Sequence, residues 1–575
     1  MSVRTTPLRW QLAPRMDDAD RAHYGDTSPL IAALLHGRGV RPAEAAVFLN
    51  DRAASLPDPM LMSGMADAVA RIRRAHESGE TVCIYGDYDA DGLTAQAVLV
   101  TAFRAWGFAD VRHYTPHRER EGYGLHDRAL AALVEQGSSL VIAVDLGISN
   151  AREIASIREH GLDVIVVDHH HIPADIPLAA AVVNPRLPGN RYPYPHLAGV
   201  GVAYALVRAL AQSGAPFARP DDALLKTLLA FVAIGTVADI VPLTGENRTL
   251  VQAGLRAIQK TDHAGLRALW ERAGIAISTT DASHIAFAIA PRLNAPGRVR
   301  GVEDAHRLLL PTAEREARLA ALALDEANQT RQTETRRAVS EAIALIDGNA
   351  LAESQRVLVV GDPTWNIGIV GLVAARLVER YHRPALVYAQ GTSTSRGSAR
   401  SIAGFDIIDA LRANAALMLH YGGHPRAAGF TVENANIDAL HRALIQCADA
   451  LTDEELTPIL HLDAQVAHAE VSLRTHDEIA KLAPFGHANA EPVLLVPSVR
   501  VREARYVGGD GSHLSFQAVL STGATVRCIA FGLGNREAEL TGAGRVDLAA
   551  TLQRDVWQGD VRLQLRVRDF RQASG

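Results

Sequence analysis

The chain contains 575 residues, of which 48% are hydrophobic and 21% are charged, and its formal net charge at pH 7 is −6. This composition is typical of a globular protein of several domains and excludes a histone-like polycation, although local charge can still favour nucleic-acid binding. Three cysteines spread over the whole chain exclude a disulfide framework, and no apolar run is long enough to span a membrane, so we expect a cytoplasmic protein.

Residues 1–55 are expected to form a polar leader with short helices, such as those over SPLIAALLHGRG and RPAEAAVFLN. From residue 56 to about 250, short apolar runs alternate with helix-like segments of about 10–15 residues. The apolar runs are ETVCIYG (80–86), SSLVIAV (138–144) and LDVIVV (162–167). This alternation predicts a parallel α/β sheet, in which ligands bind at the carboxyl ends of the strands.

Residues 251–347 are predicted to form a helical connector, because the segment 311–348 has no internal glycine or proline and begins with Pro311. A second α/β block is expected over 348–452. Residues 453–575 contain five short alternating runs with glycines between them, which predicts a small β-barrel. The expected fold class is therefore α/β, with two α/β lobes joined by a long helix and followed by a C-terminal barrel.

Acidic and histidine residues stand at the ends of four apolar runs, and we expect each group to follow its own strand. The four motifs are Asp87-Tyr-Asp89-Ala-Asp91-Gly92, Asp145-Leu-Gly147, Asp168-His169-His170-His171 and Gly235-Thr-Val-Ala-Asp239. Carboxylates and imidazoles without thiolates suit Mn²⁺ or Mg²⁺. A carboxylate such as Asp145 could bridge two ions, an arrangement that activates water for hydrolysis.

Taken alone, each motif is also compatible with a different role. The acidic loop at 87–92 is similar to Ca²⁺-binding turns, although the glutamate that completes an EF-hand loop is missing. A single aspartate before a helix can serve as its N-cap, and a lone histidine is more often a hydrogen-bonded polar residue than a ligand. Three adjacent imidazoles after a β-branched run are hard to explain by packing, and four motifs in order favour a metal site.

The ordered motifs DYDADG, VDLG, DHH and GTVAD resemble those of the DHH phosphoesterase superfamily. GGHPRAAGF at 422–430 resembles the glycine-rich signature of the DHH-associated domain, DHHA1. Four further segments are similar to the RecJ family of bacterial single-strand-specific exonucleases: PHREREGYG (116–124), PRLNAPGR (291–298), GSARS (397–401) and LAPFGHANAEP (482–492). The resemblance covers nearly the whole chain and implies a DHH catalytic domain at 56–250, a DHHA1 domain at 348–452 and an OB-fold barrel at 453–575.

The resemblance also implies roles for particular residues. Five of them would bind two divalent cations, Mn²⁺ preferred or Mg²⁺, with Asp145 as the bridge; they are Asp89, Asp91, Asp145, His169 and Asp239. Asp87 and Asp168 would orient these ligands. His170 would face the phosphate as a proton donor or a transition-state stabiliser.

Other residues would contact the nucleic acid. By resemblance, the terminal phosphate would be bound by Arg118, Ser398 and Arg400. Arg298 and His424 are candidates for stabilising charge on the reacting phosphate. Gly422 and Gly423 would let the backbone approach DNA. In the barrel, three aromatic residues either stack on bases or belong to the core; they are Tyr506, Phe516 and Trp557.

The activity implied by the resemblance is hydrolysis of single-stranded DNA from its 5′ end to 5′-mononucleotides, in DNA repair and recombination. The implied partners are single-stranded DNA with a 5′ end, a single-strand-binding protein and a helicase, for a monomer in the bacterial cytoplasm. Two alternatives stay open. A hydrolase of small phosphoesters would not need the barrel, and a non-catalytic DNA-binding relative would not keep every ligand position filled.

Overall fold

The computed structural model describes residues 7–50, 55–118, 120–299, 301–509, 511–557 and 560–573. The chain forms two compact units, each built from segments that are distant in sequence. The parallel-sheet unit comprises Asn50–Arg331 with Ala483–Ala490. The barrel unit comprises Met1–Leu49, Gln332–Leu482 and Glu491–Gly575.

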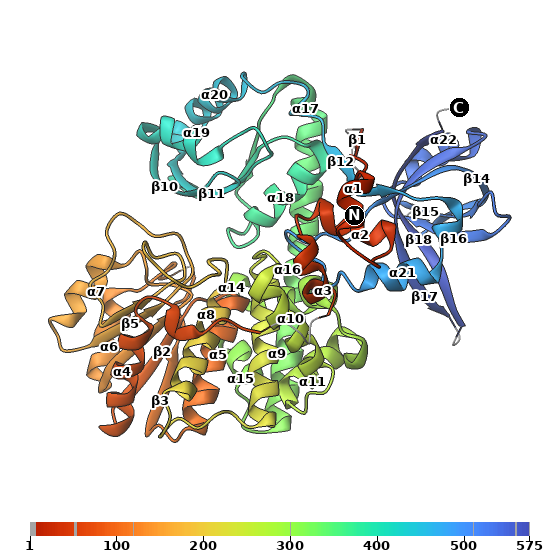
Figure 1. Ribbon diagram of the computed structural model, residues 1–575. Coiled ribbons are helices and arrows are strands. Elements are labelled where there is room, and N and C mark those ends of the chain that lie inside the picture. Colours follow the sequence, from red (N-terminus) through yellow and green to blue (C-terminus); the bar gives the residue numbers. More distant parts are fainter. Residues whose placement is uncertain are drawn as a thin grey trace. The chain divides into compact units, whose positions relative to one another are not determined.

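The parallel-sheet unit contains a five-stranded sheet with the strand order β3-β2-β4-β5-β6, in which all neighbours are parallel (Figure 1). The strands are β2 (Thr81–Gly86), β3 (Asp110–Tyr114), β4 (Ser138–Val144), β5 (Asp163–Val167) and β6 (Ala181–Val183). The three predicted apolar runs are therefore confirmed as β2, β4 and β5. The edge strands β3 and β6 were not predicted.

Helices cover both faces of this sheet, which is why its strands are apolar on both sides. Val82 and Ile84 of β2 belong to the core formed with α4 (Met65–Glu77), α5 (Ala90–Ala105) and α8 (Gly199–Gln212). Cys83 and Tyr85 alternate with them and pack on the other face, with α6 (Asp127–Glu135) and α7 (Ala151–Arg158). The strand period of two thus divides one run of residues between two cores.

Most of the other elements of this unit are helices, both within the predicted connector (251–347) and before it. Its longer helices are α9 (Asp222–Ala238), α10 (Gly245–Ile258), α11 (Ala264–Ala273) and α15 (Glu303–Leu309). Shorter segments join α11 to α15: η3 (Ile277–Thr279), α12 (Ala282–His284), η4 (Ile285–Ile289), α13 (Ala290–Asn294) and α14 (Pro296–Val299). The predicted long helix is α16 (Glu314–Gly348), which begins in this unit and ends in the barrel unit.

The barrel unit contains the second α/β block as a mixed sheet with the order β10-β11-β9-β8-β7. Its strands are β7 (Leu358–Asp362), β8 (Ala385–Gln390), β9 (Thr394–Arg400), β10 (Met418–His424) and β11 (Ala427–Glu433). Only β7 and β8 are parallel; the other neighbours are antiparallel. One face packs on α16 and α18 (Val370–Tyr381), and the other packs on α19 (Ile407–Ala413) and α20 (Ile437–Ala448).

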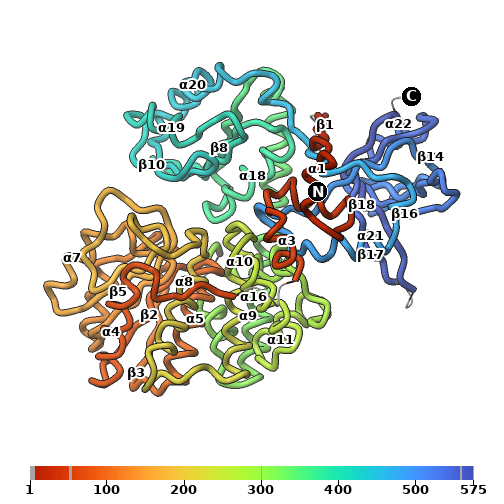
Figure 2. The backbone as a smooth tube through the Cα atoms, in the orientation of Figure 1, coloured from red at the N-terminus to blue at the C-terminus, as the bar shows by residue number. Residues whose placement is uncertain are grey.

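The predicted barrel is confirmed. Its five long strands are β14 (Leu494–Val507), β15 (His513–Val519), β16 (Thr525–Ala530), β17 (Val546–Trp557) and β18 (Asp560–Gln572), and β17 pairs with β14 to close the sheet (Figure 2). Phe516 is only 1% exposed and is therefore core, whereas Tyr506 is 57% exposed. The side chain of Trp557 lies outside the described part of the structure.

The N-terminal leader contains the two predicted helices as α2 (Pro29–Gly37) and α3 (Pro42–Leu49), and an unpredicted short helix, α1 (Asp18–Ala22), precedes them. It also contains an unpredicted strand, β1 (Arg9–Leu12), which pairs in parallel with β12 (Ile459–Leu462). Trp10 of β1 donates from Nε1 to Asp569 of β18 at 2.7 Å. In the described ranges, no helix combines the length and apolarity that crossing a membrane would need.

Candidate functional site

The carboxyl ends of the central strands bring the predicted acidic and histidine residues together. Asp87, Asp89 and Asp91 follow β2, Asp145 follows β4, and the motif that begins at Asp168 follows β5. These three positions were expected from the sequence, since parallel strands end at one edge of a sheet.

The fourth motif does not follow a strand, so that expectation was wrong. Gly235 lies in the last turn of α9, and Asp239 is the C-cap of this helix. The run LLAFVAIGTVA (228–238) is apolar on all sides because most of α9 is buried. A buried helix and a buried strand cannot be distinguished by periodicity in such a run.

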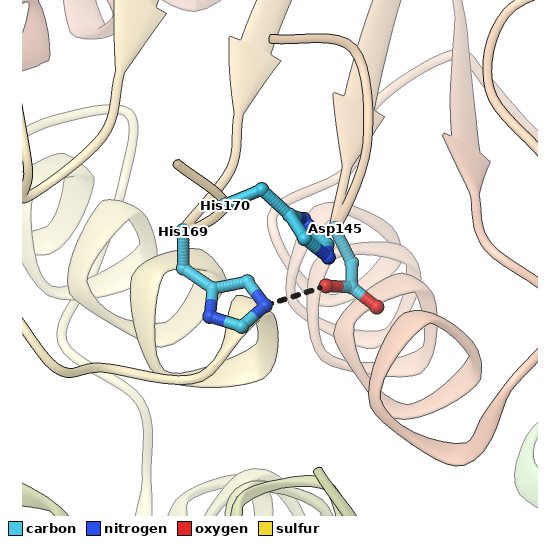
Figure 3. Close-up of side chains that lie close together, drawn as sticks. All are labelled: Asp145, His169 and His170. Carbon is cyan, nitrogen blue, oxygen red and sulfur yellow. Dashed lines mark ion pairs between the residues drawn. The ribbon is translucent and has the colours of Figure 1, made fainter. Parts of the chain in front are cut away.

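Oxygen and nitrogen atoms of these residues are close enough to share cations. Nε2 of His169 lies 3.1 Å from Oδ1 of Asp145 (Figure 3). The same nitrogen lies 3.7 Å from Oδ2 of Asp239 and 3.9 Å from Oδ2 of Asp91. Three groups have all their donor atoms within 4.8 Å of one another: Asp91 with His169 and Asp239, Asp145 with His169 and His170, and Asp87 with Asp89 and Asp145. Asp145 and His169 each belong to two groups.

Asp91 is held by the N-terminus of a helix distant in sequence. Its Oδ2 accepts from the N–H of Gly199 at 2.6 Å, and its Oδ1 accepts from the N–H of Val200 at 2.9 Å, both in the first turn of α8. The positive end of the helix dipole favours a carboxylate there. Gly235 approaches from α9, where a Cβ would lie 2.8 Å from Oδ1 of Asp91. Glycine therefore makes room for the carboxylate.

Asp89 is both an N-cap and a member of the cluster. Its Oδ1 accepts from the N–H groups of Asp91 and Gly92 at 2.9 and 3.0 Å, which caps α5. The N-cap role that the sequence left open therefore holds for one oxygen, while the carboxylate also belongs to the group with Asp87 and Asp145. Asp145 itself has φ +59°, a conformation uncommon for a residue with a side chain.

Asp168 orients its neighbours. Its Oδ1 accepts from the backbone N–H of His169 and from Nδ1 of His170, each at 2.7 Å, and its Oδ2 accepts from the N–H of Ile148 at 3.0 Å. Burial disfavours the charged forms of Asp168 and His170, but the hydrogen bond and the attraction between the two side chains outweigh this effect. The pKa of Asp168 falls to about 2 and the pKa of His170 rises to about 9.

The electrostatics of the cluster fit divalent cations. Burial and then neighbouring carboxylates raise the pKa of Asp87, Asp145 and Asp239 well above the usual range, and that of Asp91 to about 7. Among the described residues, Asp87 Oδ1, Asp145 Oδ1 and His169 Nε2 are buried without a hydrogen bond. Crowded carboxylates, together with buried oxygen and nitrogen atoms that make no hydrogen bond, require a compensating positive charge. A set of carboxylate oxygens with an imidazole nitrogen suits Mn²⁺ or Mg²⁺.

Two predicted phosphate-binding arginines lie in the same unit. The guanidinium of Arg118, shortly after β3, lies 5.2 Å from the ring centre of Tyr88, which follows Asp87. Burial, followed by repulsion from Arg118 and Arg331, lowers the pKa of Arg298 to about 10. The structure therefore gathers three arginines near one another. Sequence reasoning missed Arg331, which lies within the polar α16 and has no motif of its own.

The remaining predicted residues lie in the barrel unit. Arg400 of β9 donates from Nη1 to Oγ of Ser398 at 2.9 Å. Gly422, Gly423 and His424 lie on β10, opposite β11. Gly423 has φ +147°, and a Cβ there would lie 2.4 Å from a carbonyl oxygen of β11. This glycine is therefore required by strand packing, whereas Gly422 has open space beside it.

Sequence reasoning also missed Tyr123, Asn184 and Arg186. The hydroxyl of Tyr123 donates to the carbonyl oxygen of Asp145 at 3.3 Å and lies 3.3 Å from Nδ1 of His170. Asn184 donates to the carbonyl oxygen of His170 at 3.0 Å. The only sequence signal for Tyr123 is its place in PHREREGYG, and Asn184 and Arg186 follow the unpredicted strand β6.

Sequence comparison assigns three segments to known families. Residues 81–236 match the DHH family N-terminal domain, residues 354–450 match the DHHA1 domain, and residues 462–569 match the RecJ OB domain. The first match contains the whole cluster except Asp239. The second contains β7 to β11, and the third contains the barrel strands up to most of β18.

Relatives match nearly the whole chain. The single-stranded-DNA-specific exonuclease RecJ of Bacillus subtilis (strain 168) is 35% identical over 571 residues, which cover 98% of this chain and 70% of the relative. The crystal structure of RecJ from Thermus thermophilus in complex with Mn²⁺ has a TM-score of 0.84 at 30% identity, covering 99% of this chain and 80% of that one. The Mg²⁺ complex of the same protein has a TM-score of 0.78 at 29% identity, with 99% and 79% coverage.

Proposed function

The chain belongs to the RecJ family of single-stranded-DNA-specific exonucleases, and from this membership we propose that it hydrolyses single-stranded DNA from the 5′ end, releasing 5′-mononucleotides in DNA repair and recombination. The observation that carries the proposal is the cluster of carboxylates and imidazoles at the carboxyl ends of β2, β4 and β5, which Asp239 joins from the end of α9. Structures of relatives contain Mn²⁺ or Mg²⁺, and the donor set of this cluster fits the same ions.

We propose that five residues hold two divalent cations; they are Asp89, Asp91, Asp145, His169 and Asp239. When bound, such ions lower the pKa of a water molecule and neutralise charge on the phosphoryl group. Asp145 is assigned as the bridge because it belongs to one group with Asp87 and Asp89 and to another with His169 and His170. Asp87 shares one group with Asp89 and Asp145 and is proposed to orient them.

The chain's own residues would handle the proton and the negative charge. Asp168 fixes Nδ1 of His170 and keeps this imidazole protonated at neutral pH, since its pKa is about 9. A protonated His170 can donate a hydrogen bond to a phosphate oxygen and a proton to the leaving 3′-oxygen. His424 and Arg298 are proposed as further donors to the reacting phosphate.

We further propose that Arg118 of the parallel-sheet unit binds the 5′-terminal phosphate, that Ser398 and Arg400 of the barrel unit are phosphate-binding residues, and that Gly422 and Gly423 let the backbone approach the strand. The closeness of Arg118 and Arg298 supports a phosphate site in the parallel-sheet unit, because guanidinium groups pair with phosphate oxygens in two-point contacts. The hydrogen bond between Arg400 and Ser398 supports a second pair of phosphate-binding groups in the barrel unit.

The proposed domains are a leader (1–55), a DHH catalytic domain (56–250), a helical connector (251–347), a DHHA1 domain (348–452) and an OB-fold domain (453–575). The closed five-stranded barrel supports single-strand binding by its charged surface, with exposed Tyr506 as a base-stacking group. A monomeric state, the bacterial cytoplasm, a helicase and a single-strand-binding protein remain predictions drawn from family membership.

The test is digestion of single strands labelled at the 5′ or the 3′ end, with Mn²⁺, with Mg²⁺ or with EDTA. We expect labelled 5′-mononucleotide to appear first from the 5′-labelled strand, only with a metal ion, and duplex DNA to resist. Asp145→Asn and His169→Ala should abolish release. Release from the 3′ end, full activity in EDTA, or cleavage confined to dinucleotides would each contradict the proposal.

A further inference from the structure

The carboxyl end of β6 lies next to the metal-binding cluster, and neither the sequence motifs nor the family roles given above assign it a function. β6 pairs with β5 in register, with Val183 opposite Val167, and Asp168 donates from its backbone to the carbonyl oxygen of Val183 at 3.0 Å. The residues that follow are Asn184, Pro185 and Arg186. Arg186 therefore follows the strand at the edge of the sheet opposite to β3.

Asn184 fixes this turn against the catalytic motif. Its side chain is fully buried, donates from Nδ2 to the carbonyl oxygen of His170 at 3.0 Å, and accepts from the backbone N–H of Arg186 at 2.9 Å. Asn190 donates in turn to the carbonyl oxygen of Asn184 at 3.3 Å. The backbone of Arg186 is thus held at a fixed place relative to His170.

The guanidinium of Arg186 lies beside the cluster but does not pair with it. Its Nη1 donates to Nε2 of His171 at 3.4 Å, and its Nε is buried without a hydrogen bond. Among the described residues, no carboxylate forms an ion pair with it. Its charge still acts on two cluster members: it adds to the burial that lowers the pKa of His169, and it opposes the burial and the carboxylate repulsion that raise the pKa of Asp239.

Arg186 thus combines a buried Nε that has no hydrogen-bond acceptor among the described residues with a charge that acts on two residues of the cluster. An arginine and a carboxylate that interact in a half-buried place frequently form a two-point ion pair, and Arg186 forms none with Asp239. Here His171 orients one edge of the group, and the buried Nε has no acceptor in the described chain. A ligand with oxygen atoms could accept the remaining hydrogen bonds of the Arg186 guanidinium, and a phosphate group matches its two-pronged geometry.

We propose that Arg186, oriented by His171, binds the phosphate immediately 3′ of the scissile phosphodiester. This role rests on the proposed exonuclease function. The direction follows from the sheet order β3-β2-β4-β5-β6, in which the strands that bear the cluster lie between Arg118 after β3 and Arg186 after β6. If the 5′-terminal phosphate of the DNA is bound at the β3 edge, the scissile phosphate lies over the cluster. The next phosphate along the DNA then reaches the β6 edge.

The test removes the proposed contact between Arg186 and the phosphate in two ways, once by changing the protein and once by changing the DNA. The substrate is a short 5′-phosphorylated oligonucleotide, either natural or with a neutral methylphosphonate at the linkage 3′ of the scissile one. The proteins are the wild type, Arg186→Gln and Arg191→Gln, the last being an exposed arginine of the same loop as a matched control. Release of the first nucleotide is measured in single turnovers with Mn²⁺.

We expect Arg186→Gln to slow release from the natural strand by about tenfold, and the methylphosphonate to slow the wild type and Arg191→Gln by a similar factor. The methylphosphonate should have no further effect on Arg186→Gln, because the contact is already lost. Arg186→Lys should be intermediate, since it keeps the charge but not the fork. Calorimetric titration with Mn²⁺ should give the same affinity for all the proteins.

The assignment would be overturned if Arg186→Gln released the first nucleotide at the wild-type rate. It would also be overturned if the methylphosphonate slowed Arg186→Gln by the same factor as it slows the wild type. Weakened Mn²⁺ binding in Arg186→Gln would also overturn it, because the arginine would then support the metal ligands rather than the strand. The wild type on the natural strand tests the proposed function separately. If it releases no 5′-nucleotide, the exonuclease proposal fails, and the role of Arg186 fails with it.

Discussion

Replacing Gly199 by alanine is a sharp test of the metal-site geometry. Gly199 opens α8 and donates from its N–H to Asp91 at 2.6 Å. A Cβ at this position would lie 2.7 Å from the Cβ and Oδ1 of Asp145, whereas ordinary contact begins near 3.4 Å. Asp145 would therefore have to retreat by about 0.7 Å, and metal–ligand distances tolerate only about 0.2 Å.

We expect the Gly199→Ala variant to bind Mn²⁺ about 10- to 100-fold more weakly and to lose about 100-fold in kcat. The first is measured by calorimetric titration of the metal-free protein, and the second by release of nucleotide from a 5′-labelled single strand. Thermal unfolding in EDTA reports separately whether the fold is intact.

The matched control is Gly201→Ala, two residues further along the same helix. A Cβ there would meet only the side chain of Leu197, at 3.2 Å, so we expect metal binding and activity close to those of the wild type. Alanine is favoured over glycine within helices by about 0.5–1 kcal/mol, so weakened α8 cannot explain a loss at Gly199. Wild-type Mn²⁺ affinity in Gly199→Ala would refute the assignment of Asp145 as a ligand held in place by this contact.

Three further predictions concern the charges and hydrogen bonds of the cluster. Asp168→Asn removes the charge that raises the pKa of His170 to about 9, so the pH–rate profile should decline from about pH 6.5 instead; superimposable profiles would contradict the pairing. In EDTA, carboxylates whose pKa is raised in the folded state, such as Asp91 with a pKa of about 7, bind more protons folded than unfolded. The midpoint of thermal unfolding should therefore fall as the pH rises from about 4 to 7 and should recover with Mn²⁺, whereas a flat profile would argue against the crowding. Tyr123→Phe removes the hydroxyl between Asp145 and His170, and kcat should fall about tenfold with KM and Mn²⁺ affinity unchanged; an equal loss of metal binding would assign the hydroxyl to the ligands instead.

Much of the site could be predicted from the sequence because its chemistry follows local patterns. β2, β4 and β5 are runs of β-branched and apolar residues that end in Asp or His, and parallel strands end at one edge of a sheet. The barrel could be predicted in the same way, since alternation and glycine punctuation are properties of adjacent residues. Phe516 shows the limit, because alternation does not say whether an aromatic side chain of the barrel faces the core or the solvent.

Other features depend on contacts between distant residues. Asp239 ends a buried helix whose apolar run was mistaken for a strand, because burial on all sides removes the periodic signal. β1 pairs with β12, about 450 residues further along the chain, and nothing in RWQL indicates that partner. β6 has only three residues, too few for a periodic pattern, so Arg186 at its end could not be singled out.

Which chemical groups the site contains, and which strands carry most of them, could be read from residue types and their local spacing. The tertiary structure alone decided how the groups are held. The N-terminus of α8 donates to Asp91 across 108 positions of sequence, and Gly199 and Gly235 leave the space that Asp145 and Asp91 occupy. Such contacts arise only when helices pack against the sheet, since they require close approach of backbones that no local pattern of residues encodes.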